Sequence, residues 1–305
     1  MFDVRDVEIV QEVFARGGFR AAAQKLNLSQ SVVSARIANI ESRLGITIFM
    51  REHRGARLTP LGRRFLDQAK RLTRLRDQIA AGLHPDSGFA GTLRIGVSET
   101  VVHTWLPMML NRIRVALPNA QLELSVDTSP VLARQLLDDD IDIAVLMRES
   151  LPSGMVAVPI YACKLGWFAA VGYPVPARSL ALVDLAQSPI ITFPKDTVPF
   201  KEVKHLLSDP DLPVPLIHGC ASLATILHLV RDGFGIGLLP TQMAANDVKI
   251  GLLASLQTAS HARVSDLEFA LCYRPTQEQA TMELVRAAAL SAVEAYGRAE
   301  HSRKS

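Results

Sequence analysis

The chain has 305 residues, enough for two or three compact units, and its 49% hydrophobic and 21% charged residues exclude a disordered protein. Its apolar runs are shorter than the roughly 18 residues of a membrane span, and its start, MFDVRDVEIV, carries acids where a signal peptide has a basic segment, so we expect a cytoplasmic protein. Three widely separated cysteines exclude a C-x-x-C redox pair and a zinc site, and we expect buried thiols, no metal and no cofactor.

The net charge of +3 is divided unevenly along the chain. Residues 1–90 hold 15 Lys and Arg against 9 Asp and Glu, whereas the remainder holds 18 against 21. Nine of the basic residues lie between Arg51 and Arg76, with two acids among them. A basic surface on one small domain is expected of a protein that binds a polyanion such as DNA, although a solvated helix face would show the same excess.

The first 58 residues predict three helices followed by a hairpin. Apolar residues at helical spacing from Val7 to Phe14 indicate an opening helix that two glycines end. A second helix is expected over FRAAAQKL, and a third begins after Ser29, whose hydroxyl is expected to cap it. Gly45 is expected to end the third helix. This order of elements is that of a helix-turn-helix.

The third helix has one apolar face and one face of small polar residues. The apolar stripe recurs at i, i+4, i+7 and i+11 and is expected in the core: Val33, Ile37, Ile40 and Leu44. On the opposite face lie small residues, as a helix needs if it is to enter the major groove of DNA. The residues expected to read base edges are Gln30, Ser31 and Ser34. Those expected to support them or to meet phosphates are Arg36 and Asn39.

A basic hairpin is predicted after the third helix. The segment ITIFMREHRGARL, residues 46–58, alternates apolar residues and turns at Arg54-Gly55, which is typical of a two-stranded wing. Because the narrow minor groove concentrates negative potential, the candidates for phosphate or minor-groove contacts are Arg51, Arg54 and Arg57.

Together these segments resemble a known DNA-binding domain. The stretch GFRAAAQKLNLSQSVVSARIANIESRLGITIFMREHRGARLTPLGRRFL is similar to that of the LysR-type transcriptional regulators, with an A-A-x-x-L helix, an S-Q-containing recognition helix, an E-x-x-L-G turn and an L-T-x-x-G helix start in this order. The resemblance implies an N-terminal all-α winged helix-turn-helix (residues 1–58), a long linker helix and a C-terminal α/β two-lobed effector domain like the periplasmic binding proteins. It also implies double-stranded DNA as a partner, RNA polymerase as another, and a homotetramer built as a pair of dimers.

A long helix is predicted after the wing, within a linker of residues 59–90. Thr59 and Pro60 suit its first turn. A 4-3-4-3 spacing, the seam of a two-stranded coiled coil, is formed by Leu61, Phe65, Gln68, Leu72, Leu75 and Ile79. This seam predicts a homodimer, whereas packing of the stripe on the helix-turn-helix is the alternative. The glycines and proline of residues 82–91 predict a hinge.

From Gly91 the pattern changes to alternating strands and helices, which predicts an α/β fold with a parallel sheet. Strands are expected at TLRIGV, QLELSV, DIAVL, KLGWFAAV, PIITF, PLIHG, GIGLLP and LEFALCY, and a last helix at residues 276–295. The last strand and helix would return to the first of two lobes. This arrangement resembles the effector domain (residues 91–305) of the same regulators, with lobes at 91–161 plus 267–305 and at 162–266.

Polar residues follow several of these strands, where ligands of open α/β sheets bind. The candidates for effector contacts are Ser98, Thr100, Thr128, Ser129, Phe193, Lys195 and Ser222. Each Ser or Thr alone would also serve as a helix cap. Hydroxyls together with a lysine suggest an anionic small-molecule effector.

No H-E-x-x-H, G-x-S-x-G, G-x-x-x-x-G-K-[ST] or G-x-G-x-x-G motif occurs, and we expect no enzyme. The glycines of GFGIG follow a helix, and we interpret them as a helix C-cap and a tight turn. The leading hypothesis is a sequence-specific LysR-type transcriptional regulator whose effector prefers one of two assembly states. The alternative is a small-molecule-binding module whose N-terminal helices serve only dimerisation.

Overall fold

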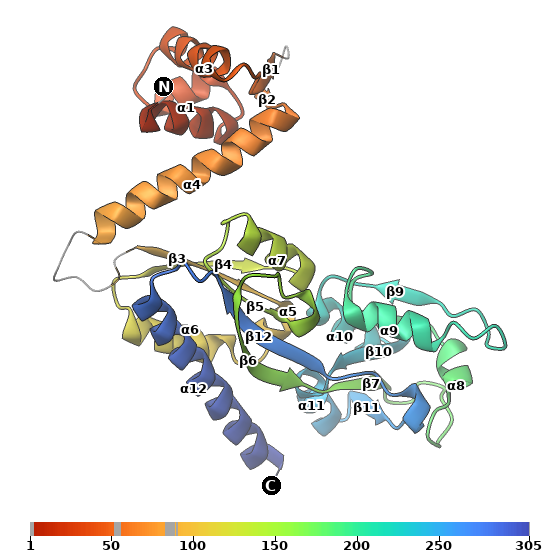
Figure 1. Cartoon of the computed structure of the whole chain (residues 1–305). Coiled ribbons are helices and arrows are strands. Elements are labelled where there is room, and N and C mark those ends of the chain that lie inside the picture. Colours follow the sequence, from red (N-terminus) through yellow and green to blue (C-terminus); the bar gives the residue numbers. More distant parts are fainter. Residues whose placement is uncertain (1–2, 52–55, 83–88, 90, 305) are drawn as a thin grey trace. The chain divides into compact units, whose positions relative to one another are not determined.

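The computed structural model describes residues 3–51, 56–82, 89 and 91–304 (Figure 1). The chain separates into two compact units, Met1–Gly91 and Thr92–Ser305. The first unit is helical with a small wing, and the second contains two mixed sheets with their helices. In the described ranges no helix combines the length and apolarity that crossing a bilayer requires.

The first unit contains the predicted helix-turn-helix. Its helices are α1 (Val4–Ala15), α2 (Phe19–Lys25) and α3 (Gln30–Leu44). The predicted cap of α3 is confirmed, because the Ser29 hydroxyl accepts a hydrogen bond from the Val32 amide at 3.3 Å. Gly45 ends the helix in the left-handed conformation, with φ of 64°. The core residues that α3 contributes are Val33, Ile37 and Ile40.

Leu44 was expected in the core, and this prediction is wrong, because its side chain is 41% exposed. The apolar stripe of α3 keeps its phase to Leu44, but Ile40 is the last residue of the helix that is buried. The stripe therefore extends beyond the helices against which α3 packs.

The predicted wing is the antiparallel pair β1 (Phe49–Arg51) and β2 (Ala56–Leu58), in which Met50 lies opposite Arg57. Helix α4 (Pro60–Gly82) follows directly. The predicted cap of α4 is present, since Thr59 Oγ1 accepts a hydrogen bond from the Gly62 amide at 2.8 Å.

Helix α4 packs on α1 with one face and leaves the predicted coiled-coil seam on another. Leu66 and Ala69 are buried, and α1 and α4 are further joined by an ion pair between Glu8 and Arg76. The exposed seam residues are Leu61, Gln68, Leu72 and Leu75. Phe65 is half-buried against the helix-turn-helix core, and the side chain of Ile79 lies outside the described residues. Most of the seam residues are therefore not covered by the rest of the described chain.

The second unit consists of two lobes, each built on a five-stranded sheet (Figure 1). Lobe I has the strand order β4-β3-β5-β12-β6, with β3 (Thr92–Val97), β4 (Gln121–Val126), β5 (Ile143–Met147), β6 (Val156–Cys163) and β12 (Leu267–Tyr273). Its helices are α5 (Glu99–Val102), α6 (Leu106–Ala116), α7 (Ser129–Leu137), the short η1 (Arg148–Ser150) and α12 (Gln279–Lys304).

Lobe II has the order β11-β7-β10-β8-β9, with β7 (Leu165–Ala170), β8 (Ile190–Thr192), β9 (Ile217–Gly219), β10 (Ile236–Pro240) and β11 (Leu253–Leu256). Its helices are α8 (Leu182–Ala186), α9 (Val198–Leu206), α10 (Leu223–Arg231), α11 (Thr241–Lys249) and the short η2 (Ser260–Ala262). The chain enters lobe II at Lys164, between β6 and β7, and returns to lobe I between β11 and β12.

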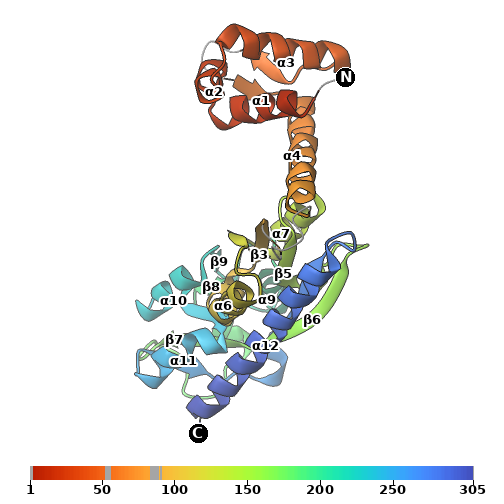
Figure 2. The same ribbon diagram turned by 90° about the vertical axis from the view of Figure 1, so that its left-hand side faces the viewer.

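Both sheets are mixed, so the expectation of parallel sheets is only partly right. Strands β4, β3 and β5 are parallel, as predicted, but β12 runs antiparallel to both β5 and β6. The cause is that the chain re-enters lobe I from lobe II and therefore arrives at β12 from the opposite end of the sheet. Helix α12 then packs on α6 and along β6, as the two views show (Figure 2).

Candidate functional site

The outer face of α3 is exposed and made of small residues. Gln30, Ser31, Ser34 and Ala35 are all exposed, whereas the opposite side of the helix is buried. The Ser31 hydroxyl lies 2.8 Å from the hydroxyl of Ser29. A face of this kind allows close approach of the helix to the floor of a major groove and offers donors and acceptors at its N-terminal end.

Arg36 and Asn39, predicted to support the base contacts, both contact other side chains of the first unit. Arg36 Nη1 donates to Asp6 Oδ1 at 2.9 Å, and Asp6 is buried at the start of α1. Asn39 Oδ1 accepts a hydrogen bond from Arg43 Nε at 3.0 Å. Arg36 therefore joins α3 to α1 and fixes the orientation of the exposed face.

Of the predicted wing contacts, Arg57 lies exposed on β2. Arg54 and the side chain of Arg51 lie outside the described residues. Sequence reasoning missed Val32, which is 41% exposed between Ser31 and the buried Val33. Its position, one residue off the buried stripe, was the signal that would have found it. An exposed aliphatic group there suits contact with a thymine methyl.

A cavity of about 790 Å³ lies between the two lobes of the second unit. Five of the seven predicted effector residues line it: Ser98, Thr100, Thr128, Ser129 and Phe193. They come together because they follow β3, β4 and β8, whose carboxyl ends face the gap between the lobes. Lys195 and Ser222 are not among the lining residues, and Lys201 of α9 is the lysine that is. The sequence predicted which strand ends lie at the cavity, but it did not determine which of the following side chains line the cavity.

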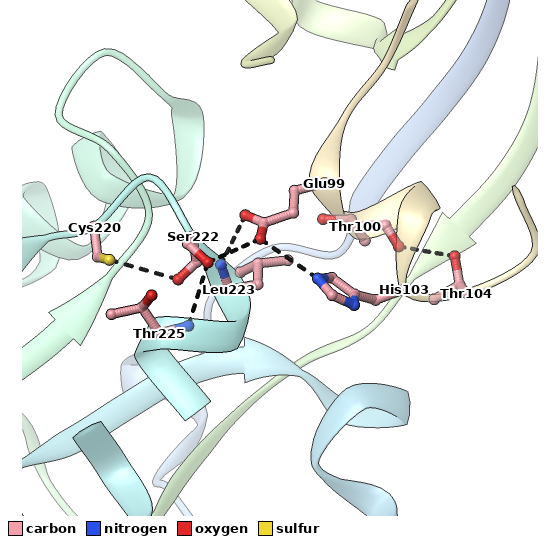
Figure 3. A network of polar contacts seen from close by, with 8 residues as sticks. All are labelled: Glu99, Thr100, His103, Thr104, Cys220, Ser222, Leu223 and Thr225. Carbon is pink, nitrogen blue, oxygen red and sulfur yellow. Dashed lines mark hydrogen bonds and ion pairs between the residues drawn. The ribbon is translucent and has the colours of Figure 1, made fainter. Parts of the chain in front are cut away.

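Sequence reasoning missed the central polar contact between the lobes, which Glu99 makes (Figure 3). Its carboxylate leaves lobe I and reaches the start of α10 in lobe II. There it accepts hydrogen bonds from the Leu223 amide at 2.7 Å and from Ser222 Oγ at 3.1 Å. His103 Nε2 lies 3.4 Å from the same carboxylate. Ser222, predicted to hold an effector, caps α10 through the Thr225 amide and binds Glu99.

The surroundings of Glu99 favour its charged form. Burial by itself would raise the pKa of Glu99, but the hydrogen bonds from His103, the Leu223 amide and Ser222 together hold the pKa below its ordinary value. The carboxylate also lies at the positive end of the α10 helix. At neutral pH the two lobes are therefore joined by an ionised group.

At the other end of the cavity, hydroxyls near β4 have structural partners. Ser129 Oγ accepts a hydrogen bond from the Met147 amide at 2.9 Å, and Thr128 Oγ1 lies 3.4 Å from Asp196 Oδ2 across the gap. Asp127 Oδ1 accepts from the Thr128 amide at 2.7 Å. The contact between Thr128 and Asp196 had no motif in the sequence, because the two residues come from different lobes.

Two family models match this chain and together cover most of it. Residues 4–63 match the bacterial regulatory helix-turn-helix protein of the lysR family, and residues 86–294 match the LysR substrate binding domain. Among curated relatives, the HTH-type transcriptional regulator CzcR of Bacillus cereus is 29% identical over 258 residues, covering 82% of this chain and 84% of the relative. The regulator YofA of Bacillus velezensis is 28% identical, covering 77% and 80%.

Solved structures share the fold over nearly the whole chain. ArgP from Mycobacterium tuberculosis has a TM-score of 0.72 at 20% identity, covering 95% of this chain and 98% of that one. CbnR, solved with its target DNA, has a TM-score of 0.69 at 20% identity, covering 95% and 100%. LysG from Corynebacterium glutamicum, solved with arginine as bound effector, has a TM-score of 0.62 at 19% identity, covering 96% and 98%.

Proposed function

Because the chain belongs to the LysR family of DNA-binding transcriptional regulators with an effector-binding domain, we propose that it reads DNA with the outer face of α3. The single observation that carries this proposal is the exposure of Gln30, Ser31 and Ser34 on a low face opposite a buried stripe. Their amide and hydroxyl groups are suited to the base edges of the major groove, and the Val32 side chain to a thymine methyl.

The basic wing is proposed to strengthen DNA binding without distinguishing one base sequence from another. Arg51, Arg54 and Arg57 are proposed to contact phosphates or the minor groove, and such contacts strengthen binding to every sequence alike. Arg36 acts through its bond to Asp6, which holds α3 in place, and Asn39 flanks the reading face. The protein acts in the cytoplasm, where DNA and RNA polymerase, its further proposed partner, are found.

Gel-shift titration on the DNA upstream of the protein's own gene tests these roles. Ser34→Ala is expected to relax sequence choice, whereas Arg54→Ala weakens binding to all sequences and lowers the salt slope by about one unit. Lys249→Ala is the matched control, because Lys249 is an exposed base at the end of α11 in the other unit. If both variants titrate like the wild type, these residue roles are wrong.

Self-association through α4 is the second part of the proposal. Leu61, Leu72 and Leu75 present an exposed coiled-coil seam, which a second copy would bury. A dimer, or a homotetramer made of two dimers, sets the spacing of two reading helices on DNA. Leu75→Glu is expected to lower the molecular mass by light scattering. An unchanged mass would show that the seam is not the contact.

The cavity between the lobes is proposed as the effector site. Its volume suits a metabolite, and Glu99 and Asp196 each contact the opposite lobe, so opening of the lobes would break these contacts. The arginine bound in the structure of LysG supports a small-molecule effector in this fold. The effector shifts DNA binding only if it prefers one state of the assembly over the other.

The alternative, a small-molecule module whose N-terminal helices serve only dimerisation, has no observation in its favour. It does not explain the family match over residues 4–63 or the exposed face of small residues on α3. No retardation of DNA at low salt would support it.

A further inference from the structure

We propose that the interlobe cavity takes a small ligand that carries a protonated amine or a guanidinium group. This inference rests on the proposed function, because it names the chemical class of the effector for the cavity already described. It reverses the sign of charge that the Ser, Thr and Lys residues suggested from the sequence.

The cavity is lined by more negative than positive charge. Its ionisable acids are Glu99, Asp127, Glu149 and Asp196. Among the described residues that line it, Lys201 is the one lysine or arginine, and His103 lies beside Glu99. In the described part of the chain, no cation forms an ion pair with Asp127, Glu149 or Asp196. A carboxylate that loses water on ligand binding needs a cation or several donors to compensate. The charges of the cavity are therefore complementary to a cationic group.

Two of these carboxylates, one from each lobe, contact Thr128. Asp127 of lobe I accepts from the Thr128 amide at 2.7 Å, and Asp196 of lobe II lies 3.4 Å from the Thr128 hydroxyl. Both carboxylates thus contact the same residue. An ammonium group has three donors and a guanidinium five, so one such group can bind both acids. Because the acids belong to different lobes, this contact favours the closed state over the open one.

One anion site of the cavity, the start of α10, is already filled by the protein. Helix α10 begins at the cavity, and its first amide would ordinarily attract a carboxylate of the ligand. The Glu99 carboxylate takes that place through the Leu223 amide and Ser222 Oγ. Lys201 remains for a single acidic group of the ligand. A zwitterion is therefore compatible with the cavity, whereas a dicarboxylate would face several unpaired acids.

Ser98 is a buried residue of the cavity wall whose hydroxyl has no partner in the described structure. It lines the cavity next to Glu99 and is only 8% exposed. Most buried hydroxyls are hydrogen-bonded, and a hydroxyl accepts from an N–H donor as readily as it donates. The Oγ is enclosed by protein atoms, so the Ser98 side chain would have to turn toward the cavity to meet a ligand nitrogen. Among the described residues no group of three acidic, His or Cys side chains is arranged to hold a metal ion, which favours an organic cation.

Thermal unfolding and calorimetric titration of the full-length protein test the proposal with three probes of similar length. Agmatine carries an amine and a guanidinium, L-arginine adds a carboxylate, and glutarate is a dicarboxylate. At about 5 mM, agmatine or arginine is expected to raise Tm, because a ligand of the folded state stabilises it, and glutarate is not. Asp127→Asn and Asp196→Asn are each expected to weaken the binding of the cationic probe about 10-fold or more, since each removes one charge-assisted hydrogen bond.

Asp211→Asn is the matched control, because Asp211 is an exposed acid that does not line the cavity. Stabilisation by glutarate alone, no shift with either cationic probe, or equal shifts in wild type and in the Asp127→Asn/Asp196→Asn double variant would each overturn the proposal. Gel shifts on the same samples separate the two levels of inference. DNA retardation with any of these three results rejects the cationic ligand and leaves the regulator function standing.

Discussion

Gly62 has no Cβ, and this allows the backbone just before the wing to pack closely against the first turn of α4. A Cβ at residue 62 would lie 2.1 Å from the Ile48 carbonyl oxygen and 2.9 Å from its carbonyl carbon. That oxygen also accepts a hydrogen bond from the Thr59 amide at 2.9 Å, and Thr59 in turn caps α4 through the Gly62 amide. Gly62→Ala must therefore move Ile48, the residue before β1, by about 1 Å to restore an ordinary contact distance.

The cost of Gly62→Ala follows from these contacts. Overpacking costs about 1–3 kcal/mol, and loss of the Thr59 hydrogen bond about 1 kcal/mol. Alanine recovers up to about 1 kcal/mol through its higher helix propensity. The net loss is about 2 kcal/mol, which for a unit of this size lowers Tm by on the order of 10 °C.

Scanning calorimetry of the full-length protein measures this loss in the transition of the first unit, and gel shifts at rising temperature follow its effect on DNA binding. Gly297→Ala in α12 is the matched control, because a Cβ there meets nothing within 4 Å. It is expected to leave Tm unchanged or slightly raised. Equal unfolding temperatures for wild type and Gly62→Ala would show that Ile48 moves freely and that the close approach has no energetic consequence.

Three further predictions concern the second unit. Because the pKa of Glu99 is held below its ordinary value of 4.5, its stabilisation is complete above that pH and is lost as the pH falls further. Glu99→Gln is expected to remove part of the decrease in Tm at acidic pH and to cost about 1–3 kcal/mol of stability at pH 7. An unchanged decrease of Tm with acid would contradict the role of the carboxylate. Arg231→Ala leaves Asp247, 2% exposed and bound at 2.5 and 2.6 Å, as an unpaired buried charge, so urea unfolding should show a loss of about 3–5 kcal/mol. A loss below about 1 kcal/mol would mean that water reaches Asp247. Burial raises the pKa of the Cys272 thiol to about 11, so Ellman's reagent should react quickly in the native protein only with the half-buried Cys220, and with all three cysteines in urea. Fast reaction of a second native thiol would contradict the described burial.

Elements with local signals were predictable from the sequence. Ser29 and Thr59 act as caps through amides three residues away, and Gly45 and Gly233 adopt the positive φ that ends a helix. Strand β6 was missed because its local signal is interrupted. It is an edge strand that contains Pro159, and the register shift opposite Phe269 leaves Ile160 as an extra residue.

The sequence by itself determined the helix-turn-helix, its exposed small face and the strand ends that line the cavity, because helical periodicity, caps and strand ends depend on neighbours a few residues apart. Only the tertiary structure decided that Arg36 binds Asp6, that Glu99 fills the start of α10, and that Asp196 lies 3.4 Å from the Thr128 hydroxyl. The contacts of Arg36, Glu99 and Asp196 join residues about 30 to 120 positions apart across helices and lobes. Their energies depend on distances that packing sets, and no short-range pattern records them.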